Sequence, residues 1–573
     1  MKLTRTVLYL FFLTTLVQCA KPGTPTGGAK DSIPPRLVNA SPKMKTTEFD
    51  KTEIRLSFDE YVTLKDLSKQ LIVSPPLERE KYTVYPQTGA SKKVTIKLKD
   101  SLLENTTYTF NFGESIVDFN ESNPLPYFTY ILSTGSEIDS LNLKGRVFDA
   151  FEKDTERFIS LQLYPIDTAY NDSTIYTKKP FYVTNTLDTL LFEFKNLRAG
   201  DYELIALQDV GSNYLFDQST DKIGFLATPI TLPTDSLITL RLFNEKLSFA
   251  WANPAYVNNH HIYLGHFGEY EGQDFEIVSD LPDSFSYLIN KNRKADSLNF
   301  WFKGAALDSL KFSFPMRDTL LTKTVFFNQE PQPDSLVIES NTKGNLSLTE
   351  PYLLSSNLPI VEIDSTKVEV FGKDSIAVPV ALEILENYDR IALQFDALPN
   401  DEYTISVFPN ALVDFLGNTN DTVKYGIRTK KIEDYGTIFL RLQYDDPEPF
   451  ILQLLDSDLN VKRFYDSPIE SGLYEFPLLD AATYYFRLIK DVNGNKEWDT
   501  GNYLEKIQPE PVIYFLDPLT RSAKKIELRA NWDLNETFNV TQNYLDLLKI
   551  GTASDVLEVP DNLEEPRLSL IHI

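Results

Sequence analysis

The sequence predicts an all-β protein, a tandem of β-sandwich domains behind a flexible N-terminal tether. Apolar and polar residues alternate along many short segments, for example at Ile54, Leu56 and Phe58, as expected for strands with one buried face. Turn-forming residues separate these segments by roughly 8–12 positions, a spacing typical of antiparallel sandwiches. The composition agrees, because 30 Tyr, 38 Phe and 33 Pro against only 3 Met favour pleated sheets and turns.

Residues 1–18 have the features of a secretory signal peptide. Lys2 and Arg5 form a basic start, and the apolar run from Val7 to Val17 is too short to span a bilayer as a helix. The sequence therefore predicts that this segment directs export and is then removed.

Cys19 is the only cysteine in the chain, and it closes the sequence LVQC. This ending resembles a bacterial lipobox, of which looser forms occur in Bacteroidota, although Gln18 stands where a small residue is usual. The resemblance implies cleavage before Cys19 and lipidation of its side chain, which would anchor the mature protein in the outer membrane. The alternative is a secreted protein in which Cys19 has no such role.

Residues 19–34 read CAKPGTPTGGAKDSIP and show no hydrophobic period, which indicates a lipidated linker that lets the first domain stand off the membrane. No acidic cluster directly follows Cys19. Such clusters resemble a surface-export signal of some Bacteroidota lipoproteins. The sequence therefore leaves both the periplasmic and the cell-surface face open.

Residues 35–134 form the first predicted sandwich. The segments IPPRLVNASP, EIRLSFDEYV and NTTYTFNFGESIVDFN resemble the bacterial Ig-like domain of surface-layer proteins, which implies a sandwich of about seven strands and no activity. Residues 339–430 resemble a second Ig-like domain. The triplet Val117-Asp118-Phe119 recurs there as Val413-Asp414-Phe415.

Residues 135–245 and 431–533 contain a sharper repeat. The segment from 191 to 217 aligns without a gap to the segment from 473 to 499, with ten identities in 27 positions, where chance gives roughly two. The shared pattern of a strand, Leu-x-Ala-x-x-Tyr and a second strand resembles the transthyretin-like, carboxypeptidase-regulatory β-sandwich. We therefore expect two transthyretin-like sandwiches.

Two segments lie outside these repeats. Residues 246–338 are rich in strand patterns such as SLNFWF and form a divergent β unit whose fold the sequence does not identify. Residues 534–573 carry Asp and Glu and lack the strand rhythm, so we expect a polar tail.

A loop of the second repeat could hold a metal ion. Asp491, Asn493, Asn495 and Asp499 supply side-chain oxygens at intervals of two or four residues, which resembles the first half of a calcium loop. Lys496 stands where such a loop needs Gly. The alternative is a turn built from Asp, Asn and Gly because they tolerate turn dihedrals. Beyond this calcium candidate, the sequence predicts no cofactor.

A short triplet of Asp, then Ser or Thr, then an aliphatic residue or Thr recurs more often than composition predicts. It resembles the O-glycosylation sequon of Bacteroidota periplasmic proteins, although it also suits the start of a strand. The serine candidates are Ser101, Ser140, Ser236, Ser297, Ser309, Ser335 and Ser375.

The residues that usually carry catalysis are scarce. The chain has four histidines, and only Cys19 offers a thiol. Asp59 and Glu60 are neighbours on a predicted strand, so their side chains point to opposite faces and form no catalytic pair. Motifs for nucleotide binding, zinc proteases and serine hydrolases are missing from the sequence. We therefore expect no enzyme.

The net charge of the chain limits the classes of molecule that it can bind. With 56 Lys and Arg against 82 Asp and Glu, the net charge of −26 argues against nucleic acid. The predicted function is a non-catalytic outer-membrane lipoprotein that acts as a scaffold for protein interactions, for example as an accessory subunit of an envelope complex. Its partners would be the membrane, through the lipid, and other envelope proteins. The alternative function is glycan binding at the cell surface, because sandwich domains often present aromatic side chains to sugars.

Overall fold

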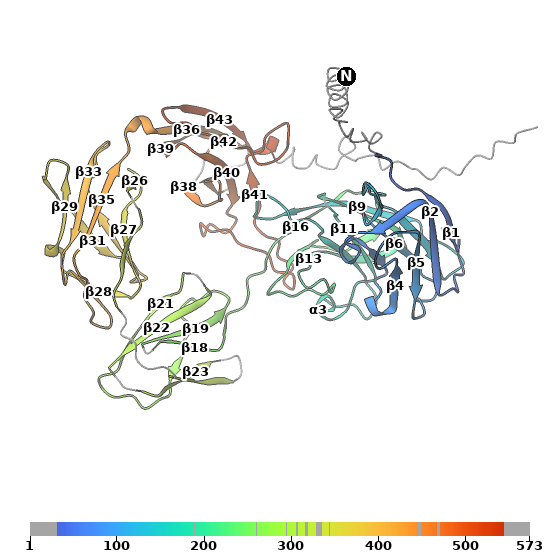
Figure 1. Ribbon diagram of the computed structural model, residues 1–573, viewed down its shortest axis with the longest axis horizontal. Coiled ribbons are helices and arrows are strands. Elements are labelled where there is room, and N and C mark those ends of the chain that lie inside the picture. Colours follow the sequence, from blue (N-terminus) through green and yellow to red (C-terminus); the bar gives the residue numbers. More distant parts are fainter. Residues whose placement is uncertain are drawn as a thin grey trace, which may run out of the picture. The chain divides into compact units, whose positions relative to one another are not determined.

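The computed structural model describes residues 31–543 except 188, 259, 294, 305–306, 316–318, 328–334, 343, 445–448 and 467–469. The described chain is almost entirely β, which confirms the predicted fold class of tandem sandwiches (Figure 1). Its α-helices are single turns, such as α2 (Leu67–Gln70) and α3 (Thr174–Thr177). No described helix has the length and apolarity needed to cross a membrane.

Contacts divide the chain into two compact units. Unit 1 comprises the chain up to Asn142 together with Phe181–Thr184 and Phe194–Arg198, and unit 2 comprises the rest. Cys19, the signal peptide and most of the linker lie outside the described residues, as does the chain beyond 543.

The first Ig-like sandwich has two sheets, with strand orders β1-β2-β5-β4 and β3-β6-β8, and β7 pairs with the end of β2. Alternate apolar residues of β2 and β5 enter the core, because strand side chains alternate between faces. The strands are β1 (Leu37–Ser41), β2 (Glu53–Leu64), β3 (Ile72–Ser74), β4 (Tyr82–Tyr85), β5 (Ser91–Leu98), β6 (Thr107–Asn111), β7 (Ile116–Asp118) and β8 (Thr129–Ser133).

The second Ig-like sandwich repeats this topology. Its sheets run β25-β27-β32-β31 and β26-β35-β33-β29-β30, and β28 pairs with β34 as β2 pairs with β7. Tyr108 and Tyr403 make the same contact, since each hydroxyl accepts a backbone N–H from five residues earlier. The strands are β25 (Ile338–Ser340), β26 (Asn345–Leu346), β27 (Tyr352–Ser356), β28 (Ile360–Ile363), β29 (Val368–Gly372), β30 (Ala377–Val378), β31 (Ala381–Ile384), β32 (Arg390–Gln394), β33 (Glu402–Val407), β34 (Leu412–Asp414) and β35 (Val423–Thr429).

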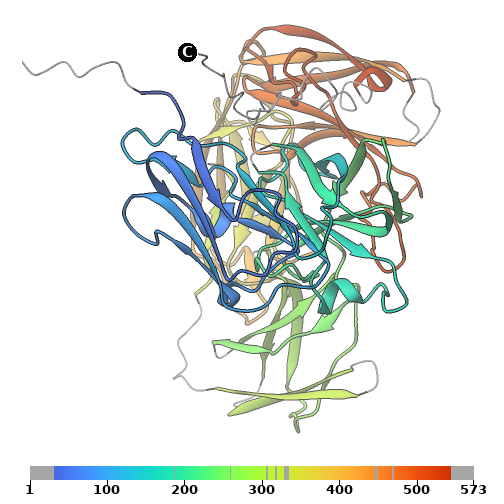
Figure 2. The ribbon, with the colours of Figure 1, turned by 90° about the vertical axis from the view of Figure 1, so that its right-hand side faces the viewer.

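The two transthyretin-like sandwiches match strand for strand. The three-stranded sheets run β12-β9-β16 and β39-β36-β43. In each sandwich the strand that comes first in the sequence pairs in parallel with the strand that comes last, β9 with β16 and β36 with β43. The larger sheets run β11-β10-β13-β14 and β38-β37-β40-β41, with β15 and β42 as side strands. Figure 2 draws the first copy in teal to green and the second in orange to red. The first copy has β9 (Leu141–Asp149), β10 (Ser160–Pro165), β11 (Tyr182–Asn185), β12 (Leu191–Leu197), β13 (Gly200–Gln208), β14 (Lys222–Phe225), β15 (Ile230–Leu232) and β16 (Ile238–Leu242). The second has β36 (Tyr435–Gln443), β37 (Phe450–Leu455), β38 (Val461–Tyr465), β39 (Gly472–Asp480), β40 (Thr483–Lys490), β41 (Val512–Tyr514), β42 (Ile526–Glu527) and β43 (Asp533–Asn539).

The divergent unit is also built from two sheets, β17-β19-β22-β21 with β18, and β20-β23-β24. Its core is aromatic, with Trp251, Phe300, Phe312 and Phe314 among its buried residues. The strands are β17 (Ala250–Trp251), β18 (Ala255–Asn258), β19 (His261–Phe267), β20 (Glu276–Ile277), β21 (Ser286–Lys291), β22 (Ser297–Lys303), β23 (Ser309–Pro315) and β24 (Leu320–Phe326).

One sequence expectation needs correction. The predicted polar tail, residues 534–573, begins inside β43, which pairs with β36 over seven positions. Only Leu534 and Phe538 of this strand are apolar, and the rest are Asp, Asn, Glu and Thr, so its apolar pattern is too sparse to reveal a strand from sequence. Phe538 is nevertheless completely buried in the core of the second transthyretin-like sandwich. The other domain boundaries stay predictions.

Candidate functional site

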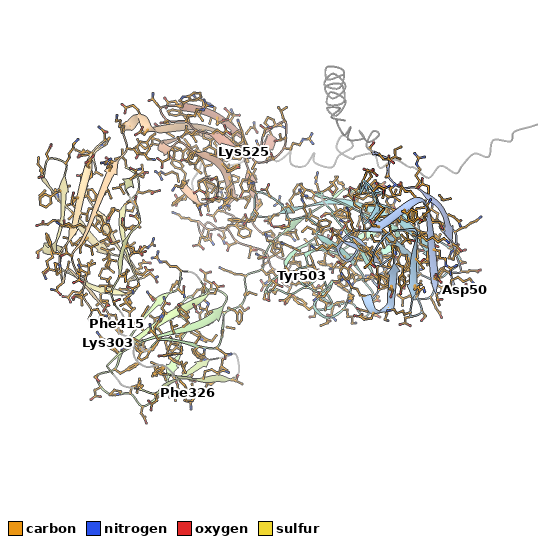
Figure 3. All side chains as sticks on the ribbon, viewed as in Figure 1. Asp50, Lys303, Phe326, Phe415, Tyr503 and Lys525 are labelled. Carbon is orange, nitrogen blue, oxygen red and sulfur yellow. The ribbon has the colours of Figure 1, made fainter. Side chains whose placement is uncertain are left out.

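A hairpin of the second transthyretin-like sandwich inserts into the first one, within unit 2. Residues 500–507, here called the Tyr503 hairpin, are closed by paired backbone hydrogen bonds of 2.9 Å between Asn502 and Ile507. Tyr503 is completely buried, and its ring meets Phe225 edge to face at 5.2 Å (Figure 3). Its hydroxyl lies 3.0 Å from that of Tyr170. Burial raises the pKa of both phenols, so both stay protonated.

Charged groups fix the same hairpin. Lys506 extends over the Tyr503 ring at 3.9 Å, and its Nζ lies 3.0 Å from Glu203 Oε1 and 2.9 Å from Asp172 Oδ1. Glu245 accepts the backbone N–H of Tyr503. Glu203 and Glu245 are buried, and burial raises the pKa of each carboxyl. The hairpin therefore brings a cation and hydrogen-bond donors to two carboxylates that are costly to bury alone.

The repeat explains where this hairpin comes from. In the first copy Asp221 accepts N–H groups from Val210 and Asp217, and in the second Glu510 accepts them from the matching Val492 and Asp499. Asp221 follows Asp217 by four positions, whereas Glu510 follows Asp499 by eleven. The second loop is thus seven positions longer, and the extra residues form the Tyr503 hairpin. Sequence reasoning missed this junction, although the length difference was visible.

The predicted calcium loop lies directly before this hairpin. Asp491 is completely buried and its carboxylate accepts backbone N–H groups from Gly494, Asn495 and Lys496. The side-chain amides of Asn493 and Asn495 both donate to Asp499, at 2.6 and 2.7 Å. The four predicted ligands are therefore brought together, but through hydrogen bonds with one another. Among the described residues, no group of three or more His, Cys, Asp or Glu could hold a metal ion. Calcium binding stays a prediction.

A second junction joins the divergent unit to the second Ig-like sandwich. Trp301, Leu358 and Phe415 form a shared buried cluster. Lys303 lies over the Phe415 ring at 4.7 Å, and its Nζ donates to the Phe415 carbonyl at 2.5 Å (Figure 3). Arg293 forms an ion pair with Asp389 at the same junction. An apolar centre with a charged rim is the usual composition of a stable interface.

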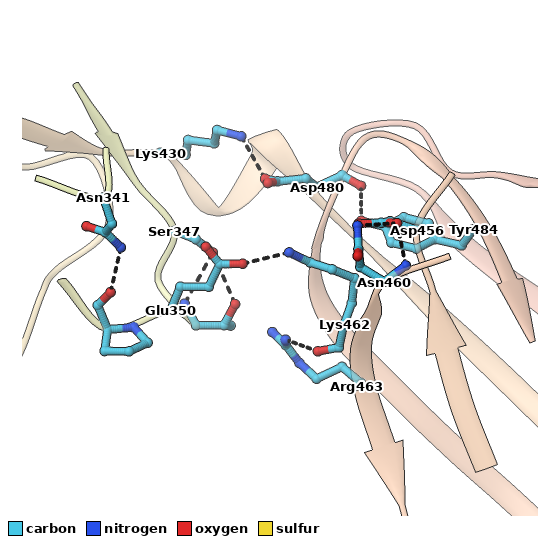
Figure 4. A network of polar contacts seen from close by, with 12 residues as sticks. Asn341, Ser347, Glu350, Lys430, Asp456, Asn460, Lys462, Arg463, Asp480 and Tyr484 are labelled. Atoms are coloured by element: carbon cyan, nitrogen blue, oxygen red, sulfur yellow. Dashed lines mark hydrogen bonds and ion pairs between the residues drawn. The ribbon is translucent and has the colours of Figure 1, made fainter. Parts of the chain in front are cut away.

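The junction between the second Ig-like and second transthyretin-like sandwiches is polar. Lys430 pairs with Asp480 at 2.7 Å, and Lys462 pairs with Glu350 at 2.8 Å (Figure 4). Tyr435 adds a hydroxyl that accepts the backbone N–H of Leu348. These partly exposed ion pairs contribute little individually, typically about 0–1 kcal/mol.

The candidate glycosylation serines differ in exposure. Five lie exposed in loops and turns: Ser101, Ser140, Ser236, Ser335 and Ser375. Ser309 is half-buried in β23, and Ser297 is only 8 % exposed in β22. A glycan at Ser297 would have to be accommodated inside the folded unit, so this serine is the least suited of the seven.

The three histidines within the described residues, His260, His261 and His266, have structural partners. His261 is buried and stacks on Trp301 at 3.8 Å with an angle of 11° between the rings. Burial lowers the pKa of His261 to about 4, so the ring is neutral at physiological pH. His260 and His266 each place Nδ1 within hydrogen-bond distance of a backbone carbonyl.

A surface cleft of about 480 Å³ lies on the first Ig-like sandwich, within unit 1. Its walls include Leu64, Leu71, Tyr82 and Arg79, and the Arg79 guanidinium donates to the Ser68 carbonyl. No carboxylate, histidine or thiol is among the residues that line it. The lining of the cleft thus lacks the carboxylates and histidines that most often act as general acids and bases.

Comparisons with known proteins give one family match and several similar solved structures. Residues 31–132 match the family described as a bacterial Ig-like domain. Similar solved structures include surface layer protein SbsC, domains 1–6 (9% identity, 87% of this chain and 67% of that chain, TM-score 0.14). Another is the major pilin subunit BcpA of Bacillus cereus (11% identity, 70% and 99%, TM-score 0.14). No curated protein matches the chain. The family match is confined to the first sandwich, and the sheet topology of the second Ig-like sandwich repeats that of the first.

Proposed function

We propose that the protein is a non-catalytic outer-membrane lipoprotein that acts as a scaffold for protein interactions in the cell envelope. The observation that carries this proposal is a series of sandwiches, two of whose junctions are packed with buried side chains. Within unit 2, buried side chains join the divergent unit to the second Ig-like sandwich, and the Tyr503 hairpin joins the two transthyretin-like sandwiches. Tandem Ig-like domains have a structural or interaction role, and loops on such a framework can hold partners in fixed positions.

Cys19 supports the membrane part of the proposal, because the only thiol of the chain stands at a lipobox-like ending. Cells that make the full chain should incorporate labelled palmitate into the wild type and not into Cys19→Ala. The wild type should sediment with outer membranes, whereas Cys19→Ala should be released in soluble form. Equal labelling of the two proteins, or equal sedimentation, would refute lipid anchoring.

Protease added to intact cells then distinguishes the two faces of the membrane. Digestion of the wild type from outside would place it on the cell surface and favour adhesion or a surface complex. Protection until the outer membrane is opened would place it in the periplasm and favour a role in envelope assembly.

The proposed envelope complex has its own test. Purification in mild detergent should yield the lipoprotein in a larger assembly with defined envelope proteins. A monodisperse monomer under the same conditions would count against the scaffold role. A glycan array tests the alternative, because glycan binding requires reproducible hits that a scaffold does not produce.

A further inference from the structure

The two Ig-like sandwiches share one turn, which has a different environment in each copy. The backbone N–H of Phe119 donates to the Tyr61 carbonyl at 2.9 Å, and that of Phe415 donates to the Pro359 carbonyl at 2.8 Å. The strand register agrees, since Asp118 and Asp414 hold equivalent places in β7 and β34. Phe119 is therefore the structural counterpart of Phe415.

In the second copy this turn is covered. Phe415 is only 8 % exposed, because Trp301 packs against it and Lys303 lies over its ring. Leu358, two residues before the paired position in β28, is also buried there. The covering surface is an aromatic side chain and a lysine from one strand, β22, of a neighbouring β-domain.

In the first copy the same turn is open. Phe119 is 57 % exposed and Tyr61, the counterpart of Pro359, is 56 % exposed. Two large aromatic side chains side by side in water are costly to leave uncovered, and such a patch usually marks an interaction surface. We call Tyr61 and Phe119 the Phe119 face, and Glu60, the residue before Tyr61 in β2, borders it.

The charge around the Phe119 face also differs from that in the second copy. Glu60 takes the place of Leu358, two residues before the paired Val62. Partial burial and nearby carboxylates raise the pKa of Glu60, and these carboxylates belong to Asp118, Asp59, Asp31 and Glu121. Lys92, which lies over the Tyr61 ring at 5.6 Å and donates to the Asp59 carbonyl, is a cation at the edge of the face. The face is thus aromatic with an acidic border.

We propose that the Phe119 face docks a partner protein that presents an aromatic side chain together with a lysine or arginine. The partner would cover Phe119 as Trp301 and Lys303 cover Phe415, and its cation would meet Glu60 where the second copy has an apolar contact. Aromatic and cationic side chains are typical interface anchors. A second copy of this chain fits poorly, because its own Trp301 and Lys303 already cover Phe415 and each chain carries a net charge of −26. Anionic headgroups would meet the acidic border.

The position of the face in the chain suits an envelope partner. Asn123, in the loop after Phe119, donates its side-chain amide to the Asp31 carbonyl, so the chain arrives from its N-terminal side beside this face. Asp31 follows Cys19 by twelve positions, a reach of at most about 40 Å. This placement near a membrane rests on the lipid anchor proposed above, whereas the docking itself does not.

Site-specific photo-crosslinking in intact cells tests the docking. A benzophenone amino acid replaces Phe119 in the full chain, and the control places it at Phe326, an exposed aromatic side chain of β24. We expect a discrete adduct with one envelope protein from position 119 and none from position 326. The adduct peptide should contain a lysine or arginine. Adducts of equal strength at both positions, adducts with lipid, or adducts with a second copy would each overturn the proposal.

Charge reversal tests the predicted cation. Glu60→Lys should reduce the adduct about tenfold or more, whereas Glu60→Gln should reduce it less, because like charges repel across an interface. Calorimetry should show that neither variant melts at a lower temperature than the wild type, since both remove a carboxylate that stands among other carboxylates. An adduct that withstands Glu60→Lys would refute the acidic contact. Palmitate labelling of the same cells keeps the two proposals apart, because the absence of any adduct from position 119 in an otherwise wild-type, lipidated chain refutes docking alone.

Discussion

The hydroxyl of Tyr503 lies 3.0 Å from the hydroxyl of Tyr170, although 333 positions separate the two residues. Each phenol supplies the polar partner that the other needs in a buried setting. Because Tyr170 belongs to the first transthyretin-like sandwich and Tyr503 to the second, this contact makes the two sandwiches of unit 2 depend on each other for stability.

Removing the Tyr503 ring should weaken this junction. Tyr503→Ala is expected to lower the free energy of unfolding by about 3–5 kcal/mol, as for other buried aromatic side chains. Calorimetry should show an earlier transition, and hydrogen exchange should increase in the hairpin and around Phe225. Leu504→Ala is the matched control, because Leu504 is exposed in the same hairpin and should change stability little. Equal stability of Tyr503→Ala and the wild type would contradict the packing.

Lys506 should contribute most to the free energy of unfolding at neutral and alkaline pH. Lys506→Met leaves Glu203 buried without its cation, and we expect a loss of about 2 kcal/mol, below that of a fully buried pair because Lys506 is partly exposed. Burial raises the pKa of Glu203, so its ionised form costs stability as the pH rises above the unfolded value. The free energy of unfolding that Lys506→Met removes should therefore become smaller as the pH falls towards 4.5. Denaturant melts at several pH values measure it, and Glu203→Gln should restore much of the loss. A pH-independent loss would argue against the ion pair.

His261 should make the divergent unit sensitive to acid. Its pKa falls from 6.5 to about 4 on folding, so the unfolded chain binds the proton more readily between these values. The free energy of unfolding is then highest above pH 6.5. It decreases as the pH falls towards 4, by an amount on the order of 3 kcal/mol. His261→Phe keeps an aromatic ring against Trp301 without a titrating group. The difference between wild type and variant should flatten above pH 6.5, and parallel pH profiles would contradict the assignment.

Calcium at about 1 mM, the level that weak extracellular sites require, should leave the melting temperature unchanged. The physical reason is that the Asn493 and Asn495 amides donate to Asp499, so their N–H groups face the carboxylate that a cation would need. A stabilising shift in the wild type that disappears in Asp499→Asn would instead establish the calcium site.

Native protein should be heavier than its polypeptide mass if the five exposed serines carry glycans. Intact-mass measurement before and after substitution of Ser101 and Ser375 by Ala should show a stepwise decrease. Ser297→Ala should leave the mass increment unchanged because this hydroxyl is buried. Native protein with the bare polypeptide mass would end the glycosylation hypothesis.

The sequence predicted the repeated topology well, because the alternating positions that identify strands are the positions that fill the cores. The ten identities between the segments starting at Leu191 and Leu473 reflect this, since Phe194, Tyr202 and their counterparts are buried in both sandwiches. The strand β43 escaped prediction because few of its residues are apolar. It is held by parallel pairing with β36, a long-range contact that no local pattern encodes.

The junctions could not be predicted from the sequence pattern alone. Phe119 and Phe415 occupy the same place in the same motif, yet one is exposed and the other buried, because burial depends on the neighbouring domain. Tyr503 likewise lies in a polar stretch, GNYLEKI, whose only signal is its extra length relative to the sister loop. The residues that the two copies share thus indicate the fold of each domain, whereas the residues in which the copies differ indicate where one domain contacts another.

The parallel pairing of first and last strands has a mechanical consequence. Strands β9 and β16 run in the same direction over five paired positions, and β36 and β43 do so over seven. A pull on the chain at the two ends of such a sandwich drags the paired strands past each other along their length. The hydrogen bonds between them are then loaded together instead of being unzipped one at a time. Each transthyretin-like sandwich therefore resists tension in the direction of the chain.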